Sequence, residues 1–189
     1  MAEHVILFAG PMGAGKTTAI RSLSEIEVVS TEALNTERCI VDKATTTVGL
    51  DYGELTLGVD EKVRLYGAPG QRRFAFMWDV LAQRARALML LVNNDAPDPL
   101  ESTRRFLAQF PALVEKGAVV VGISRTDLAR TPLVHEYARA IAEWHPGRTI
   151  PVFTADPRSA SHMRTLLMAL VANVEAAELV SEQQQSEVA

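Results

Sequence analysis

The sequence predicts an α/β fold with a doubly wound, six-stranded, mostly parallel sheet, one antiparallel hairpin strand, and helices on both faces. Short apolar runs alternate with helical stretches along the 189 residues, as in parallel α/β domains. The runs at 87–92 and 118–123 are continuously apolar, which is typical of strands buried on both faces. A glycine-rich loop follows the first run directly, at the strand end where such sheets bind ligands.

Six apolar runs are expected to form the strands. Two of them flank a turn at 58–61 and have the spacing of a β-hairpin. The runs cover residues 4–9, 48–57, 62–66, 87–92, 118–123 and 150–154.

Helices are expected between the strands, where apolar residues recur at helical spacing. Thr131 can cap one helix with Pro132 at its first position, and Pro111 is expected to end or bend the helix before it. The last helix includes Met163. We expect one domain over residues 1–180 and a flexible polar tail over 181–189.

Composition excludes several classes of function. The net charge is -4 and the arginines are scattered, which argues against a nucleic-acid-binding protein. Cys39 is the only cysteine, so the chain forms no internal disulfide and no multi-cysteine metal site. The four histidines show no metal-binding spacing. Without a long apolar run or a signal peptide, the expectation is a cytoplasmic protein with no lipid anchor and no direct membrane insertion.

The glycine-rich loop, residues 10–17, reads GPMGAGKT and fits the P-loop pattern G-x-x-x-x-G-K-[ST] between a strand and a helix. Its backbone N–H groups would surround phosphate oxygens, Lys16 would reach the β- and γ-phosphates, and the Thr17 hydroxyl would bind Mg²⁺. The alternative is a glycine-rich turn with an ordinary surface lysine. The phosphate-binding residues are expected to be Gly10, Gly13, Ala14, Gly15, Lys16, Thr17 and Thr18.

Four later segments decide which class of P-loop protein this is. Residues 44–51 read ATTTVGLD, residues 65–71 read LYGAPGQ, residues 122–127 read GISRTD, and residues 154–156 read TAD. With the P-loop, they resemble the Ras-like small GTPases over residues 4 to about 175. The resemblance is to the bacterial branch near the gliding-motility (Mgl-type) GTPases, the Arf family and the β subunit of the signal-recognition-particle receptor. It implies a small GTPase domain with GTP or GDP and Mg²⁺ as ligands.

The first two segments resemble the switches. The resemblance implies that Thr47, or its neighbour Thr46, reaches Mg²⁺ and the γ-phosphate. The alternative for the three threonines is a β-prone surface run. It further implies that Gly70 offers its N–H to the γ-phosphate and that Gln71 orients the attacking water. Lys16, Thr47 and Gln71 are then the catalytic set, and Thr17 and Thr47 the metal ligands.

The other two segments resemble the base-recognition loops. The resemblance implies that Asp127 accepts from guanine N1–H and the 2-amino group, and that Ala155 offers a backbone N–H to O6. Arg125 can stack its guanidinium on the base. Ser124 stands where the family has asparagine. The alternative for Asp127 is an N-cap of a helix that follows it.

The chain departs from the family pattern at two positions. Gly67 replaces the usual switch aspartate, so Mg²⁺ must rely on Thr17, Thr47, phosphates and waters, or on an acid that the sequence does not identify. Magnesium is therefore expected to be held more loosely than in a GTPase with that aspartate. Met12 replaces a glycine and would crowd Gln71, which predicts slow hydrolysis.

The switch region also contains candidate charges and a candidate partner surface. Arg72 and Arg73 could supply positive charge in cis, or be the solvated start of the switch helix. Phe76 and Val80 lie off the apolar face of that helix, which favours a surface for a partner protein.

The resulting hypothesis is a GTP-binding molecular switch that hydrolyses GTP slowly and signals through a switch-binding partner. By analogy alone, that partner is a roadblock-type (longin-like) dimer. A nucleotide-loaded adaptor with negligible turnover is a second hypothesis, and a small P-loop kinase is a third.

Overall fold

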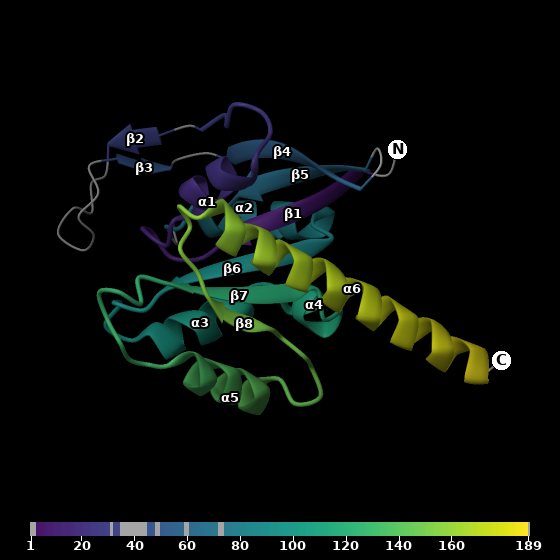
Figure 1. The fold of residues 1–189 in the computed structure, drawn as a ribbon. Coiled ribbons are helices and arrows are strands. Elements are labelled where there is room, and N and C mark those ends of the chain that lie inside the picture. The colour runs from purple at the N-terminus through teal and green to yellow at the C-terminus, as the bar shows by residue number, and fades with distance from the viewer. Residues whose placement is uncertain are drawn as a thin grey trace.

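A mixed sheet of six strands lies at the centre of the computed structural model, which describes residues 3–30, 32–34, 45–47, 50–58, 61–71 and 74–188 (Figure 1). Its strands are β1 (Glu3–Ala9), β4 (Asp51–Leu57), β5 (Glu61–Gly67), β6 (Ala87–Asn93), β7 (Val119–Ser124) and β8 (Val152–Thr154). Their order across the sheet is β4-β5-β1-β6-β7-β8. Only β4 runs antiparallel, paired with β5, so the predicted hairpin and parallel sheet are confirmed.

A second, two-stranded sheet was not predicted. β2 (Glu32–Leu34) pairs antiparallel with β3 (Thr45–Thr47), which contains the threonine run assigned to the first switch. Threonine is β-branched and favours extended backbone, so this run fits a strand as well as a switch loop.

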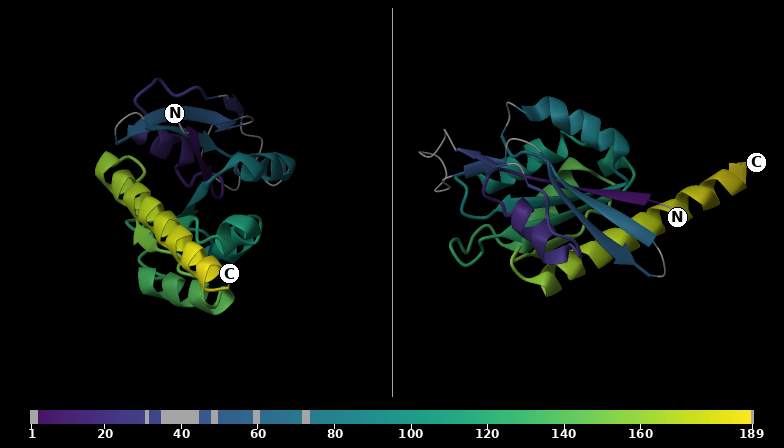
Figure 2. Two further views of the ribbon diagram at one scale, coloured as in Figure 1. Left: turned by 90° about the vertical axis from the view of Figure 1, so that its right-hand side faces the viewer. Right: turned by 90° about the horizontal axis from the view of Figure 1, so that it is seen from above.

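Helices cover both faces of the six-stranded sheet. They are α1 (Lys16–Leu23), α2 (Ala75–Arg84), α3 (Pro99–Leu107), α4 (Pro111–Glu115), α5 (Val134–Trp144) and α6 (Ala160–Val188). α1 and α6 contact each other on one face, and α3 contacts α5 on the other. Figure 2 shows α1 and α6 on the opposite side of the sheet from α2. No helix among the described residues combines the length and apolar character that crossing a bilayer requires.

Two helix boundaries near prolines differ from the predictions. α5 begins at Val134 rather than Pro132, because the Glu136 carboxylate accepts the Leu133 N–H at 2.7 Å and so completes the first turn there. α3 ends before Pro111, as expected, but Pro111 then opens a separate helix, α4, since proline is well tolerated at the first helical position.

The last helix extends to Val188, into the segment for which we expected a flexible polar tail (Figure 1, yellow). The flexibility of residues 181–189 stays a prediction. Residues 181–189 contain neither glycine nor proline and are rich in glutamate and glutamine, which favour helix.

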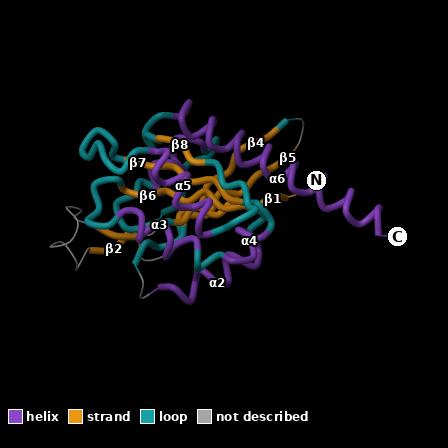
Figure 3. The backbone as a smooth tube through the Cα atoms, turned by 90° about the horizontal axis from the view of Figure 1, so that it is seen from below, coloured by secondary structure: helices purple, strands orange, loops and turns teal. Residues whose placement is uncertain are grey.

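The core lies along β6 and β7, in which every residue is buried. Figure 3 shows the strands converging between the helices, with loops gathered at the end of the sheet away from the two chain termini. Tyr137 of α5 is fully buried and donates its hydroxyl to Asn94 Oδ1 at 2.7 Å. Asn94 in turn donates to the Ala129 carbonyl at 2.7 Å, which links the end of β6 to the loop that follows β7.

Removal of this hydroxyl is expected to destabilise the protein. Burial raises the pKa of the Tyr137 phenol, so it remains a hydrogen-bond donor across the physiological range. Tyr137→Phe leaves the buried Asn94 oxygen without its donor and should lower the free energy of unfolding by about 1–3 kcal/mol. Urea denaturation measures this as a lower midpoint with an unchanged slope. An unchanged midpoint would show that the link contributes nothing.

Candidate functional site

The glycine-rich loop of residues 10–17, which we call the P-loop after the sequence pattern that it matches, joins β1 to α1 and buries the amine of its lysine. Lys16 is 8% exposed, and its Nζ donates to the Gly10 and Pro11 carbonyls at 2.8 Å each. Gly15 precedes the helix and no side chain caps it, nor is there an acidic residue in the first turn of α1. A positive helix end and a buried ammonium therefore meet in one loop, which suits a bound anion.

Two glycines of the loop are required by close packing. Gly10 has φ 137°, and a Cβ there would lie 1.9 Å from the Leu91 carbonyl oxygen. Gly15 has φ 93°, and a Cβ there would lie 2.5 Å from Pro157 Cγ. The P-loop thus packs directly against β6 and against the loop that follows β8.

A buried carboxylate lies beside the P-loop threonine. Asp51, at the start of β4, is 1% exposed and accepts the Thr17 hydroxyl at Oδ2, 2.6 Å away. Its other oxygen accepts the Ser30 hydroxyl. A carboxylate and a hydroxyl in contact are hard oxygen donors of the kind that Mg²⁺ prefers, so these residues fit the ion.

Asp51 supplies a candidate for the acid that is missing at Gly67. The two residues face each other in the register of β4 and β5, and a Cβ at Gly67 would lie 2.9 Å from both Asp51 Cβ and Asp51 Oδ2. The acid that the sequence did not identify is therefore available on the neighbouring strand. It occupies the space that a side chain at position 67 would need, so an aspartate at 67 would clash with it rather than add a second ligand.

The segment after β5 lies against the P-loop. A Cβ at Gly70 would be 2.7 Å from Met12 N and 2.9 Å from Lys16 Nζ, so the two loops are in van der Waals contact. Gln71 is 4% exposed, and its Nε2 lies 3.6 Å from Met12 Sδ. The contact expected between Met12 and Gln71 is thus present. Trp78 of α2 holds the segment from the other side by donating to the Pro69 carbonyl at 2.9 Å.

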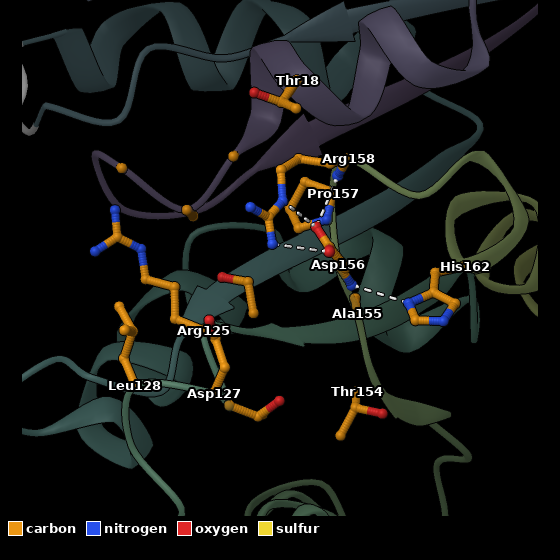
Figure 4. A pocket seen from close by; sticks show the side chains of 15 residues that line it. Thr18, Arg125, Asp127, Leu128, Thr154, Ala155, Asp156, Pro157, Arg158 and His162 are labelled. Carbon is orange, nitrogen blue, oxygen red and sulfur yellow. Dashed lines mark hydrogen bonds and ion pairs between the residues drawn. The ribbon is translucent and has the colours of Figure 1, made fainter.

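A pocket with a volume of about 480 Å³ opens on the other side of the P-loop (Figure 4). Three segments line it: the P-loop and start of α1, the residues after β7, and the loop after β8. The lining residues predicted from the sequence are Gly13, Ala14, Gly15, Thr18, Ser124, Arg125, Asp127 and Ala155. The structure therefore brings together the segments that the sequence predicts to bind phosphate and to recognise the base.

The residues after β7 are arranged as a turn. Arg125 has φ 60°, a conformation that is uncommon outside glycine, and its guanidinium pairs with Asp95 at 2.9 Å. Asp127 is exposed at the pocket. The alternative role for Asp127 as a helix N-cap is wrong, because the next helix begins only at Val134.

Sequence reasoning missed Asn93. Ser124 is buried, and its hydroxyl donates to the Val92 carbonyl at 3.1 Å rather than to the P-loop. Asn93 is the β6 partner of Ser124 in the sheet register, and its amide donates to the Met12 carbonyl at 3.3 Å. An asparagine at the end of a buried strand next to a P-loop strand was the signal that could have identified it.

The role expected for the Ala155 backbone is also wrong. Its N–H donates to the Ile123 carbonyl at 2.8 Å, as part of the pairing between β7 and β8, and so is not directed at a ligand. Next along the chain, the Asp156 N–H is 3.2 Å from His162 Nδ1. Ala155 still lines the pocket, but its N–H is not available to a ligand there.

Some predicted residues fall outside what the structure describes. Thr47 has a described backbone position, paired with Glu32 in the small sheet, but not a described side chain. Arg72, Arg73 and Cys39 lie outside the described residues. Within the described ranges, no three His, Cys, Asp or Glu side chains gather in a metal-binding cluster. The roles given to Thr46, Thr47, Arg72 and Arg73 stay predictions.

Comparison of the whole chain with protein-family models finds no matching family. Comparison with curated protein sequences finds no significant match either.

The Asp51 side chain fills the space that a side chain at position 67 would need, and this can be tested by moving the carboxylate from position 51 to position 67. Gly67→Asp should reduce the free energy of unfolding by at least about 2 kcal/mol, because it overpacks the strand end and sets two carboxylates together. The double variant Asp51→Gly, Gly67→Asp should recover much of that loss in thermal unfolding. Ala112→Asp, at an exposed position away from this strand end, is the control for an added carboxylate. If the double variant is less stable than Gly67→Asp alone, the two positions do not compete for one space.

Proposed function

We propose that this protein binds guanine nucleotides with Mg²⁺ and acts as a molecular switch that hydrolyses GTP slowly. The observation that carries the proposal is the approach of Gly70 to Lys16 Nζ. A phosphate held by that amine would lie next to the backbone of residues 69–71, so loss of the phosphate would release the segment. That is the coupling a nucleotide switch requires.

The pocket supports the choice of ligand. A volume of about 480 Å³ is in the range of small-molecule sites. The pocket is continuous with the P-loop on one side and reaches Asp127 on the other, so a nucleotide would extend from phosphates to base along it. A carboxylate suits guanine, which presents two adjacent donors at N1 and the 2-amino group.

The donor set supports Mg²⁺ as the cation. Thr17 and Asp51 would hold the ion or its waters, and the bound ion would supply charge neutralisation for the phosphates. Because Thr17 donates its proton to Asp51, the lone pairs of its oxygen are free to face a cation. With this carboxylate beside Thr17, Mg²⁺ is not expected to be held loosely despite Gly67. The position-swapped variants described above, measured for the Mg²⁺ dependence of GDP release, test this assignment.

The switch segment supports slow hydrolysis. Gln71 is buried against Met12, so its amide must turn away from the sulfur before it can orient a water. A partner that ordered this segment would accelerate the reaction. Phe76 and Val80 of α2 are 67% and 58% exposed, and this supports a partner surface adjoining the switch. A longin-like dimer is one candidate by analogy.

The contact between Met12 and Gln71 also favours the adaptor hypothesis, in which nucleotide is bound but not turned over. No feature of the described residues favours a kinase over these two functions.

Base specificity is the first test. Wild-type protein should bind GDP in isothermal titration and bind ADP far more weakly. Asp127→Asn should lose GDP affinity on the order of 10²- to 10⁴-fold, because two charge-assisted hydrogen bonds are lost, and should gain xanthine nucleotide binding. Lys16→Ala is the control that should remove binding of all nucleotides. Equal affinities for ADP and GDP in the wild type would contradict the assignment of Asp127.

Turnover is the second test, because it separates a switch from an adaptor. Met12→Gly should release Gln71 and raise the single-turnover rate of GTP hydrolysis. Gln71→Ala should abolish any stimulation by a partner, which in related reactions is worth on the order of 10³–10⁵ in rate, while leaving GTP affinity nearly unchanged. If wild type and Met12→Gly both show no hydrolysis above background, with or without candidate partners, the adaptor hypothesis is favoured.

A further inference from the structure

Backbone donors are scarce on the pocket wall formed by residues 155–158. The Ala155 N–H pairs with β7 at 2.8 Å, and the Asp156 N–H is directed to His162 Nδ1 at 3.2 Å. Proline at 157 has no N–H, and the Arg158 N–H donates to Asp156 Oδ1 at 3.0 Å. An acceptor on a ligand at this wall must therefore be met by a side chain.

Arg158 is the side chain in position to do so. Its Nε lies 2.9 Å from Asp156 Oδ1 and its Nη2 lies 3.0 Å from Asp156 Oδ2, a two-point fork that holds the guanidinium plane. The fork uses two of the five guanidinium N–H groups. Figure 4 shows the guanidinium between Asp156 and the hollow of the pocket, with Arg125 on the opposite side.

The charges around Arg158 match the pattern of guanine. Hydrogen bonding to Asp156, and more weakly the charge of Asp127, raise the pKa of Arg158, so the cation and the Asp127 carboxylate belong to one pocket. Guanine presents the acceptor O6 beside the donors N1–H and 2-amino. Adenine presents a 6-amino donor where guanine has O6, and a guanidinium cannot accept from it.

We propose that Arg158, positioned by Asp156, donates to the O6 atom of guanine and thereby excludes 6-amino purines. The inference rests on the proposed guanine-nucleotide function and deepens it. Asp127 selects the donor edge of the base, and Arg158 selects the acceptor beside it. Asp156 is a positioning residue, because its carboxylate holds the guanidinium plane and does not itself meet the base.

The experiment compares GDP with 6-thio-GDP, whose sulfur is a weak hydrogen-bond acceptor in place of O6. Wild type should prefer GDP. Arg158→Ala should weaken GDP binding roughly 10- to 100-fold, the range for a hydrogen bond from a charged donor, and weaken 6-thio-GDP much less, so that the preference disappears. Arg130→Ala removes the same charge from an exposed residue that does not line the pocket, and should leave both affinities unchanged.

A double variant distinguishes an O6 contact from the effect of an uncovered carboxylate. Asp156→Ala, Arg158→Ala should bind GDP as weakly as Arg158→Ala. Recovery of wild-type affinity would mean that the single variant had only uncovered the Asp156 charge, and overturns the proposal. Equal loss for GDP and 6-thio-GDP in Arg158→Ala points to a phosphate contact and also overturns it.

The same titrations distinguish failure of this inference from failure of the proposed function. If wild type binds no guanine nucleotide at all, the proposed function fails and the inference fails with it. If wild type binds GDP through Asp127 but Arg158→Ala keeps the preference for GDP over 6-thio-GDP, the role of Arg158 alone is wrong.

Discussion

The parallel pairing of buried strands determines where every loop of the candidate site lies. β1 sits between β5 and β6, and β7 and β8 follow β6, so five parallel strands end at the same edge of one sheet. β6 and β7 are wholly buried, and their register pairs Asn93 with Ser124 at this edge. The P-loop, the segment 69–71 and the pocket wall around Asp127 therefore meet because the strands before them are parallel and end together.

Within that constraint, a functional group can sit on either of two paired strands. Asp51 lies opposite Gly67 and fills the space that a side chain there would take. Asn93 lies opposite Ser124 and holds the Met12 carbonyl, while Ser124 turns to β6. In both pairs the polar group lies at the end of the neighbouring strand instead of at the position that the family pattern predicts. Paired residues are close neighbours, so such an exchange keeps the group within reach of the same loop.

The segment after β5 is held by contacts on two sides. On one side Trp78 donates to the Pro69 carbonyl and packs its ring against Phe106 and Phe110, 5.4 and 6.4 Å away between centroids. On the other side the Gln71 amide meets the Met12 sulfur, a weak acceptor. The start of the segment is thus anchored in the core of the α2 face, while the Gln71 side chain lies against the P-loop.

The sequence by itself determined the six strands of the central sheet and the match to the P-loop pattern, because both depend on local pattern. Apolar runs without interruption form strands buried on both faces, and the motif from Gly10 to Thr17 needs only a strand before it and a helix after it. Only the tertiary structure decided which polar groups lie at the candidate site and which of them are already paired. The Ala155 N–H donates to the neighbouring strand β7, and the acid beside Thr17 comes from β4. Arg158 lies on the pocket wall and is paired with Asp156. Each of these contacts depends on which residues of a neighbouring strand or turn lie close by in space, and the sequence pattern does not contain the distances between them.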